Sequence, residues 1–366
     1  MNMRLEALRA LMREREVPAL LVSAVANRRY ISGFSGSAGN LLISDEAALL
    51  FTDGRYTVQP GARRTTFSLR TVSSERPLLT LIVEAVSELG LDIIGFEAAH
   101  TTVAAHTALV DALVKQGDTV PELRPVEGLV EQLREVKDAA ELTTLRRAIA
   151  ITDAAITAVI PELRPEHSEL QAAWMLEVAL RERGAEAISF PIIVAAGRNA
   201  ALPHAQPGTT LLGSGQPIII DMGGRVAGYH ADLTRTIVLG EPDATFREIY
   251  GTVLAAQQRA IAGLRAGLRT SDADALAREP IEAAGYGKAF SHSLGHGVGL
   301  YIHEGPALRK PMPGQEDKAP LLRAGVVTSV EPGIYLADWG GVRIEDLVLI
   351  TDEGCEVLSA APKLSI

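Results

Sequence analysis

The chain has 366 residues, of which 47% are hydrophobic and 22% are charged, and its formal net charge is -10. This length fits two domains with hydrophobic cores, and the negative charge argues against a surface that binds nucleic acid or an anionic membrane. The single cysteine excludes an intramolecular disulfide and a cysteine-based zinc site. No apolar stretch reaches the roughly 18 residues of a membrane span, and no signal peptide opens the chain, so we expect a cytoplasmic protein.

The first third of the chain alternates short apolar runs with helical patterns, which predicts an α/β domain. An amphipathic helix comes first, followed by predicted strands at 20–22, 40–43, 47–51 and 93–96 and predicted helices at 77–89 and 101–115. Residues 122–128 contain a proline, charges and a glycine, which indicates a connection between domains. We therefore expect a first domain over 1–126 and a second over 127–366.

The second domain begins with helices and then becomes rich in glycine and strands. A helical pattern covers 129–160 with a break near Lys137–Asp138, and a second helix covers 168–183. Beyond residue 187 the pattern predicts strands at 188–195, 217–222, 232–239, 326–330 and 342–350, with helices at 244–266 and 271–284. This half is predicted to be α+β, with mostly antiparallel strands.

One glycine-rich stretch, SHSLGHGVGLYIHEG at 291–305, holds three of the eight histidines, His292, His296 and His303. Gly295 and Gly297 flank His296 and allow backbone or ligand to approach closely. The alternation after His296 predicts a short strand with His303 near its end. Neutral imidazole offers a nitrogen lone pair at physiological pH, so this stretch suits either metal binding or proton transfer.

Four carboxylates of the same domain stand beside apolar residues at predicted strand positions, where an unpaired charge is costly to bury. Asp221 follows the three isoleucines of IIIDMGG, and Asp232 begins DLTRTIVLG eleven residues later. A hairpin is therefore expected to bring the two together. Glu331 follows GVVTSV, and Glu345 lies within VRIEDLVLI. With His296 they form a mostly oxygen ligand set, which suits two divalent cations, manganese or cobalt at least as well as zinc.

The order Asp, Asp, His, Glu, Glu, in the contexts DMGG, DLTRT, GHGVGLYIHE, VEPGIY and RIED, resembles the pita-bread metallopeptidases. Within that family, PHAQPG at 203–208 and GGVRIED resemble the Xaa-Pro-specific branch, which includes aminopeptidase P and prolidase. NRRYISGFSGSAG and LFTDGRY resemble the creatinase-like N-terminal domain of the same branch. The resemblance covers nearly the whole chain. It implies an α/β creatinase-like domain followed by an α+β pita-bread catalytic domain.

The resemblance implies a role for each matched residue. Asp221 would chelate one metal, Asp232 and Glu345 would bridge both metals, and His296 and Glu331 would complete one metal shell. Glu331 would also take a proton from the bridging water. The implied cofactors are two divalent ions, Mn²⁺ first, with Co²⁺ or Zn²⁺ as alternatives.

Other residues are expected to contact the substrate. By the same resemblance, His204 and His303 would stabilise the oxyanion or the leaving group, and His292 would support a pocket for proline. Arg343 precedes Glu345 by two residues and so shares its strand face. Its planar guanidinium is suited to orient a ligand carboxylate or to bind the carboxylate of the substrate. The aromatic and apolar candidates for the wall of the proline pocket are Phe190, Tyr229, Ile302 and Tyr335.

Two subtypes of activity stay open. Aminopeptidase P removes the first residue of longer peptides that have proline second, whereas prolidase cuts Xaa-Pro dipeptides and needs a clamp on the free carboxylate. Arg309 and Lys310, in the loop after His303, are candidate clamps, yet such a basic loop is usually solvated. We therefore favour the aminopeptidase and keep the dipeptidase as the alternative.

Remoter alternatives are a metal-free creatinase-type hydrolase and a non-enzymatic relative that binds protein or nucleic acid. The complete set of five ligands argues against both, and the net charge of -10 argues against nucleic acid. The expected partners are proline-containing peptides and a second copy of the chain, in a homodimer. The first domain is expected to support this dimer and to influence substrate access.

Overall fold

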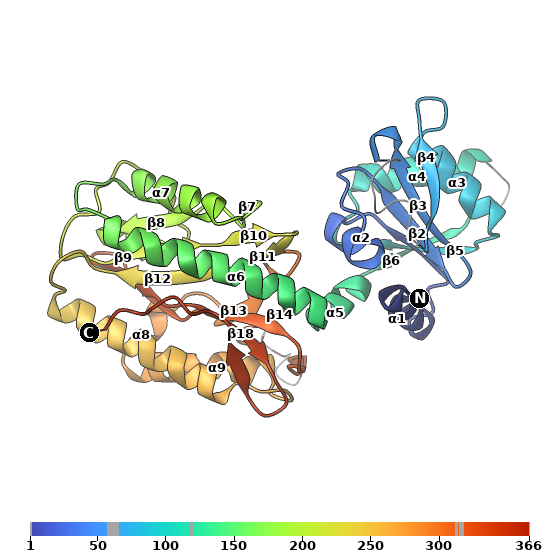
Figure 1. Cartoon of the computed structure of the whole chain (residues 1–366). Coiled ribbons are helices and arrows are strands. Elements are labelled where there is room, and N and C mark those ends of the chain that lie inside the picture. The colour runs from blue at the N-terminus through green and yellow to red at the C-terminus, as the bar shows by residue number, and fades with distance from the viewer. Residues whose placement is uncertain (1, 57–65, 117–119, 312–313, 315–317, 366) are drawn as a thin grey trace. The chain divides into compact units, whose positions relative to one another are not determined.

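The computed structural model divides the chain into two compact units, Met1–Arg134 and Glu135–Ile366 (Figure 1). The division lies later than the boundary expected after residue 126, because helix α5 (Leu129–Glu135) is tied to the first unit. The buried Arg134 donates from Nη1 to Asn27 Oδ1 at 2.7 Å. The structure describes residues 2–56, 66–116, 120–311, 314 and 318–365.

The described part of the first unit is a mixed sheet with helices packed against it. Its strands are β1 (Ala19–Val22), β2 (Asn40–Ser44), β3 (Ala48–Asp53), β4 (Ser68–Val72), β5 (Ile93–Glu97) and β6 (Glu122–Val126). Its helices before α5 are α1 (Met3–Glu14), α2 (Val25–Ser32), α3 (Leu78–Glu88) and α4 (Val103–Gln116). The strand order is β4–β3–β2–β1–β5–β6. Strand β1 is antiparallel to β2 and parallel to β5.

The predicted strands and helices of this unit are confirmed, but one expected connection is wrong. Residues 122–126 form β6, which pairs parallel with β5 from Ile93↔Glu122 to Glu97↔Val126. β6 lies at the edge of the sheet, where Pro125 is tolerated because an edge strand leaves half of its backbone groups unpaired. A proline therefore did not mark the domain boundary here.

The second unit combines helices with strands that are antiparallel in every pairing between its described residues. The helices are α6 (Ala139–Val159), α7 (Glu169–Glu182), α8 (Ala244–Gly263) and α9 (Thr270–Ala283). The strands before α8 are β7 (Ala187–Ile188), β8 (Ile193–Ala196), β9 (Ile218–Met222), β10 (Gly224–Val226), β11 (Tyr229–His230) and β12 (Leu233–Ile237). The strands after α9 are β13 (Gly295–Gly297), β14 (Glu304–Leu308), β15 (Val327–Val330), β16 (Gly333–Leu336), β17 (Gly340–Arg343), β18 (Asp346–Ile350) and β19 (Cys355–Val357).

The predicted break before α6 is confirmed, and it is a capping box. Asp138 Oδ1 accepts from Glu141 N at 2.9 Å, and the Glu141 carboxylate accepts from Asp138 N at 3.0 Å. Ser168 and Gln171 make the same reciprocal arrangement at the start of α7. Such a box satisfies backbone N–H groups that the first turn leaves open.

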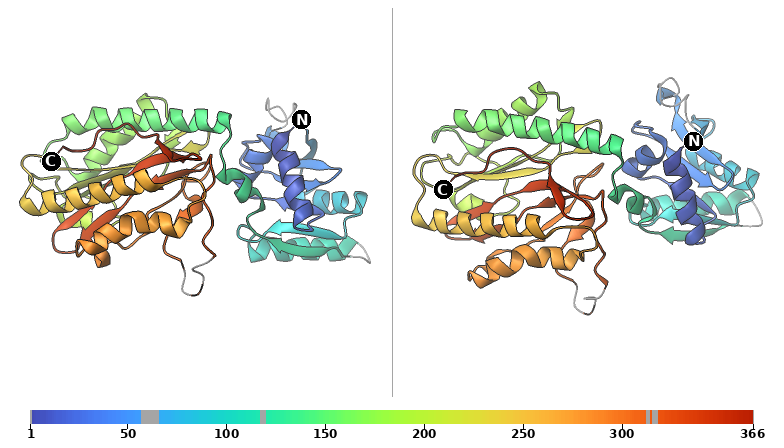
Figure 2. Two further views of the ribbon diagram at one scale, coloured as in Figure 1. Left: turned by 90° about the horizontal axis from the view of Figure 1, so that it is seen from below. Right: turned by 60° about the horizontal axis from the view of Figure 1, so that its bottom comes forward.

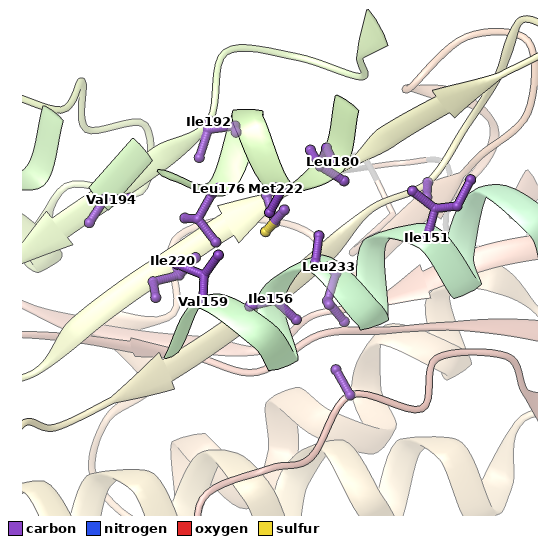
Figure 3. Packing of buried hydrophobic residues seen from close by; sticks show 14 of the residues in the cluster. Ile151, Ile156, Val159, Leu176, Leu180, Ile192, Val194, Ile220, Met222 and Leu233 are labelled. Carbon is purple, nitrogen blue, oxygen red and sulfur yellow. The ribbon is translucent and has the colours of Figure 1, made fainter. Parts of the chain in front are cut away.

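Two large hydrophobic cores lie among the described residues of the second unit. In the first, α6 and α7 pack on β8, β9 and β12, and Figure 3 shows Ile156, Leu176 and Ile220 meeting there. In the second, α8 and α9 lie side by side (Figure 2) and pack on β15 and β18, with Phe246 and Val348 in the core. Because side chains alternate along a strand, Ile220 faces the helices, whereas its neighbour Asp221 faces the other side of the sheet.

Three predicted strands differ in the structure. The strand expected over 188–195 is divided into β7 and β8, which belong to different sheets. The strand expected over 342–350 is broken: β17 ends at Arg343, β18 begins at Asp346, and they belong to different sheets. The strand expected after His296 is also wrong, because β13 ends at Gly297 and β14 begins only at Glu304. The pairing of β13 with β14 also shifts register between His296 and Gly297.

The glycines that flank His296 allow the neighbouring backbone to approach closely, as the sequence indicated. A Cβ on Gly295 would overlap the carbonyl oxygen of Ser329, and one on Gly297 would overlap that of Gly305. Strand β13 can therefore lie tightly between its neighbours only with glycine at both positions. No helix among the described residues is long and apolar enough to cross a membrane.

Candidate active site

Three carboxylates meet on the side of the sheet that faces away from α6 and α7. Asp221, Asp232 and Glu345 each offer an oxygen, and these oxygens lie within 4.8 Å of one another. Asp221 is on β9 and Asp232 immediately precedes β12, its hairpin partner, as the sequence predicted. Glu345 lies between β17 and β18, where its N–H donates to Thr234 O at 3.1 Å.

Each of the three carboxylates has one oxygen that accepts no hydrogen bond from the described residues. Asp221 Oδ1, Asp232 Oδ1 and Glu345 Oε1 are buried and have no hydrogen-bond donor among the described residues. Burial, together with the neighbouring carboxylates, raises the pKa of Asp232 and of Glu345 well above the ordinary value. Buried carboxylates without partners are costly. A divalent cation would supply the missing partner to all three, so this donor set fits a metal ion.

His296 and Glu331 extend the cluster from the facing sheet. His296 Nε2 lies 3.3 Å from Glu331 Oε1 and 3.6 Å from Asp232 Oδ2. His296 Nδ1 is 3.1 Å from the carbonyl oxygen of Gly297. Since a carbonyl only accepts, Nδ1 carries a proton, so Nε2 is the nitrogen that faces the carboxylates, as a donor to Glu331 in the metal-free protein and as the nitrogen that would bind a metal.

Glu331 is the carboxylate of the cluster that is kept ionised. Burial acts to raise its pKa, but the hydrogen bond and charge of His296 outweigh burial and lower the pKa to about 2. Ser329 Oγ donates to Glu331 Oε1 at 3.0 Å and accepts from His296 N at 3.0 Å. The hydroxyl of Ser329 therefore connects the backbone of His296 to the carboxylate of Glu331.

Arg343, Tyr335 and His292 form a hydrogen-bonded chain that starts at Asp221. Arg343 Nη2 donates to Asp221 Oδ2 at 2.7 Å, and Nη1 donates to the Tyr335 hydroxyl at 2.9 Å. The Tyr335 hydroxyl is 2.8 Å from His292 Nε2, and burial raises the pKa of Tyr335 to about 12. His292 Nδ1 faces the carbonyl of Ser293 at 2.8 Å, so Nε2 is the acceptor of the tyrosine proton. The guanidinium of Arg343 is thus occupied by hydrogen bonds that orient Asp221 and Tyr335.

The cluster opens into a cavity of about 410 Å³. All five predicted ligands line it, and so do six predicted substrate residues, Phe190, His204, His292, Ile302, His303 and Arg343. The ring of His303 lies 4.1 Å from that of His296, measured between centroids. Burial and the neighbouring His296 lower the pKa of His303.

Not every predicted substrate residue lines the cavity: Tyr229, Tyr335, Arg309 and Lys310 are not part of its wall. Tyr229, in the short hairpin β10–β11, turns toward α6, where its hydroxyl donates to Glu141 Oε1 at 2.9 Å. Arg309 is exposed beyond the end of β14 and does not line the cavity. Its neighbour Lys310 pairs with Glu282 at 2.8 Å, outside the cavity as well.

Several residues of the cavity wall were missed in the sequence. They are Pro191, Ile193, Pro203, Ala205, Gln206 and Ser293. The motif PHAQPG contains three of them, so that motif could have identified more than His204. The supporting hydroxyls of Thr234 and Ser329 were missed too, although a hydroxyl residue at a buried strand position beside an acidic residue was a usable signal.

Comparison with known families and structures agrees with this architecture. The chain matches the Creatinase/Prolidase N-terminal domain over residues 4–136 and Metallopeptidase family M24 over residues 143–352. The chain therefore belongs to metallopeptidase family M24, and it carries the N-terminal domain of the creatinases and prolidases. The predicted family and fold class are confirmed.

Individual relatives match over nearly the whole chain. The Xaa-Pro dipeptidase of Pyrococcus furiosus is 34% identical over 361 residues, which cover 98% of both chains. The structure of an Xaa-Pro dipeptidase from Bacillus anthracis has 38% identity and a TM-score of 0.92, over 99% of this chain and 98% of that one. The structure of an X-Pro aminopeptidase from Thermotoga maritima has 35% identity and a TM-score of 0.86, over 96% of this chain and 98% of that one.

Proposed function

We propose that this protein is an exopeptidase that cuts the peptide bond between a first residue and proline, with two divalent metal ions as cofactors. The observation that carries the proposal is the set of three buried carboxylate oxygens without donors, gathered in one cavity. His296 and Glu331 bring the donor set to four carboxylates and one imidazole. Four negative charges in one site suit two divalent ions better than one, and the oxygen-rich set favours Mn²⁺, with Co²⁺ or Zn²⁺ as alternatives.

The residues of the site divide the chemistry among them. A bound metal pair supplies a hydroxide near neutral pH and polarises the scissile carbonyl. Glu331, ionised beside His296, is placed to take the proton of the attacking water. His303, whose pKa is lowered by burial, is neutral and donates from its ring N–H to the oxyanion that develops on the carbonyl. His204 faces the same cavity and is proposed to act on the leaving group.

Proline in the second position is compatible with this site. The bond before proline is a tertiary amide with no N–H, and attack at a metal-polarised carbonyl needs no amide hydrogen. Phe190, Ile193 and Ile302 give the cavity an apolar wall for the pyrrolidine ring. His292 borders the same space and is proposed to support the proline.

The two subtypes are favoured by different observations. The names of the relatives from Pyrococcus furiosus and Bacillus anthracis favour a dipeptidase. The exposed position of Arg309 favours an aminopeptidase, because it removes the carboxylate clamp that the sequence offered. The dipeptidase therefore fits at least as well as the aminopeptidase that the sequence analysis favoured.

Hydrolysis of Ala-Pro, Ala-Pro-Ala and Ala-Ala by the protein loaded with Mn²⁺, Co²⁺ or Zn²⁺ tests the proposal. We expect cleavage of at least one proline substrate and none of Ala-Ala. Cleavage of Ala-Pro alone assigns the dipeptidase, and cleavage of Ala-Pro-Ala with release of free alanine assigns the aminopeptidase. Failure to cut either proline substrate with any of the three metals contradicts the proposed function.

A homodimer is also proposed. Helix α7 exposes Leu170 and Trp174, whose side chains border an apolar surface cavity of about 810 Å³. Large exposed apolar side chains that lie together are typical of protein interfaces. Light scattering at working concentration tests this proposal, and a monomeric mass contradicts it.

A further inference from the structure

A buried ion pair lies in α9, outside the cavity described above. Asp274 and Arg278 are four residues apart, so they share one face of the helix, and only 1% and 7% of their surfaces are exposed. Arg278 Nε donates to Asp274 Oδ2 at 2.6 Å, and Nη2 donates to Asp274 Oδ1 at 2.9 Å. Burying two charges gains little stability by itself, so what the pair holds in place is of interest.

The pair holds the backbone of the segment 290–294. Arg278 Nη1 donates to Phe290 O at 2.9 Å, and Nη2 donates to His292 O at 2.6 Å. Asp274 Oδ1 accepts from Leu294 N at 3.0 Å. The guanidinium carbon of Arg278 also lies 4.1 Å from the centre of the Phe290 ring. Every second residue of the segment is therefore attached to the pair.

This segment precedes β13 and meets the sheet at Leu294, whose N–H also donates to Leu308 O at 2.9 Å, and it carries parts of the site. The imidazole of His292 lines the cavity and meets the edge of the Phe290 ring at 5.2 Å between centroids. Leu294 O accepts from Glu331 N at 2.8 Å. The position of the His292 ring thus depends on contacts to both Tyr335 and the Asp274–Arg278 pair.

We propose that Asp274 and Arg278 are positioning residues that hold His292 against the proline of the substrate. This inference rests on the proposed function, since it assigns the place of His292 in that same site. His292 is not among the residues proposed to hold the metals, so loosening it weakens substrate binding and leaves the chemical step nearly intact.

The test uses a paired variant that leaves no buried charge behind. In Asp274→Asn with Arg278→Met, the amide oxygen still accepts from Leu294 N and the methionine still covers Phe290, but the carbonyls of Phe290 and His292 lose their donors. The matched control is Glu177→Gln with Arg181→Met on α7, an ion pair at the same spacing whose side chains are 31% and 46% exposed. Arg278→Lys serves as a second variant, because it keeps the charge and loses the fork of donors.

With an Xaa-Pro substrate, we expect the paired variant and Arg278→Lys to raise KM about tenfold and to leave kcat within about twofold. The affinity for Mn²⁺, measured by calorimetry, is expected to stay unchanged, and the α7 control is expected to match the wild type. Adding His292→Ala to the paired variant is expected to leave KM where His292→Ala alone puts it, because both changes act through one ring.

Three results would overturn the inference in an active protein. They are an unchanged KM in both α9 variants, a fall in kcat with KM preserved, and an effect of the paired variant that multiplies that of His292→Ala. If the paired variant does not fold, Arg278→Lys decides by the same criteria. A wild-type protein that cuts no Xaa-Pro substrate is a separate outcome, which contradicts the proposed function itself.

Discussion

Thr234 Oγ1 donates a hydrogen bond of 2.8 Å to Glu345 Oε2. This bond joins β12 to the gap between β17 and β18, whereas the other oxygen, Glu345 Oε1, has no donor among the described residues. The hydroxyl therefore orients the carboxylate that the family resemblance assigns as a bridge between the metals. Hydrogen bonds of this kind behind a ligand are typical of metal sites.

Thr234→Val is accordingly expected to lower the affinity for Mn²⁺ by about 10- to 100-fold. Valine keeps the shape of threonine, but the second oxygen of Glu345 then has no donor and can turn. Calorimetric titration of the metal-free protein measures the change. Thr143→Val on the exposed face of α6 is the control, because its hydroxyl bonds only the helix carbonyl of Ala139. Equal affinities in both variants would refute this role for Thr234.

Asp232→Ala and Glu345→Ala are each expected to lower kcat/KM for an Xaa-Pro substrate by about a thousandfold or more, because each removes a carboxylate that the family resemblance assigns to both metals. The fold is expected to survive, since each change also removes a buried carboxylate whose charge is unfavourable in the metal-free protein. Circular dichroism and thermal unfolding of the metal-free variants check the fold. Glu353→Ala, at an exposed turn, is the control. Turnover at the wild-type rate in either ligand variant contradicts the dinuclear site.

The metal-free protein is expected to lose stability as the pH rises above the ordinary range of carboxyl groups. Burial raises the pKa of Asp232 and Glu345 in the folded chain. The unfolded chain therefore releases these protons at lower pH than the folded chain, and the free energy of unfolding falls as the pH increases through the raised pKa values.

Metal binding reverses this trend, because the cation takes the place of the protons. Affinity for Mn²⁺ is expected to increase with pH, and binding is expected to raise the melting temperature more at about pH 8 than at about pH 5. Differential scanning calorimetry with EDTA-treated and Mn²⁺-loaded protein measures both effects. A metal-induced shift of the melting temperature that is the same at both pH values would count against proton displacement from these carboxyls.

Phe190 and Tyr229, both expected in the proline pocket from the sequence, are predicted to differ when mutated. Phe190→Ala removes part of the cavity wall, so KM is expected to rise about tenfold, in line with about 1–3 kcal/mol for a lost apolar contact. Tyr229→Phe leaves KM unchanged but removes the donor to Glu141, which lowers the free energy of unfolding by about 1 kcal/mol. Steady-state kinetics and denaturant titration separate the two effects. A raised KM in Tyr229→Phe would restore its place in the pocket.

Much of the second unit followed from local patterns. Asp138 and Ser168 are the N-caps of α6 and α7, and such caps can be recognised in a sequence because capping depends on residues within one turn. The spacing from Asp221 to Asp232 predicted a hairpin, and the structure pairs β9 with β12 as expected. Such features depend on neighbours in the chain, and for that reason they could be read directly from it.

Other features depend on packing between distant segments. Tyr229 is an aromatic residue of the kind that lines apolar pockets. The hairpin β10–β11 packs on α6, however, and that contact directs the ring away from the cavity. The run VRIEDLVLI has the pattern of one strand, yet Arg343 and Asp346 pair in different sheets. Glu345 lies in the interruption between these strands, and its carboxylate faces the cluster.

The sequence by itself determined the order of the ligands, the helices with their caps and the glycines around His296. These are properties of residue type and short spacing. Only the tertiary structure decided which side chains share a cavity, that Arg343 is committed to Asp221, and that Asp274 and Arg278 hold the segment of His292. Those contacts join residues far apart in the chain, so no local period or motif encodes them, and they arise when two separate cores bring the sheets together.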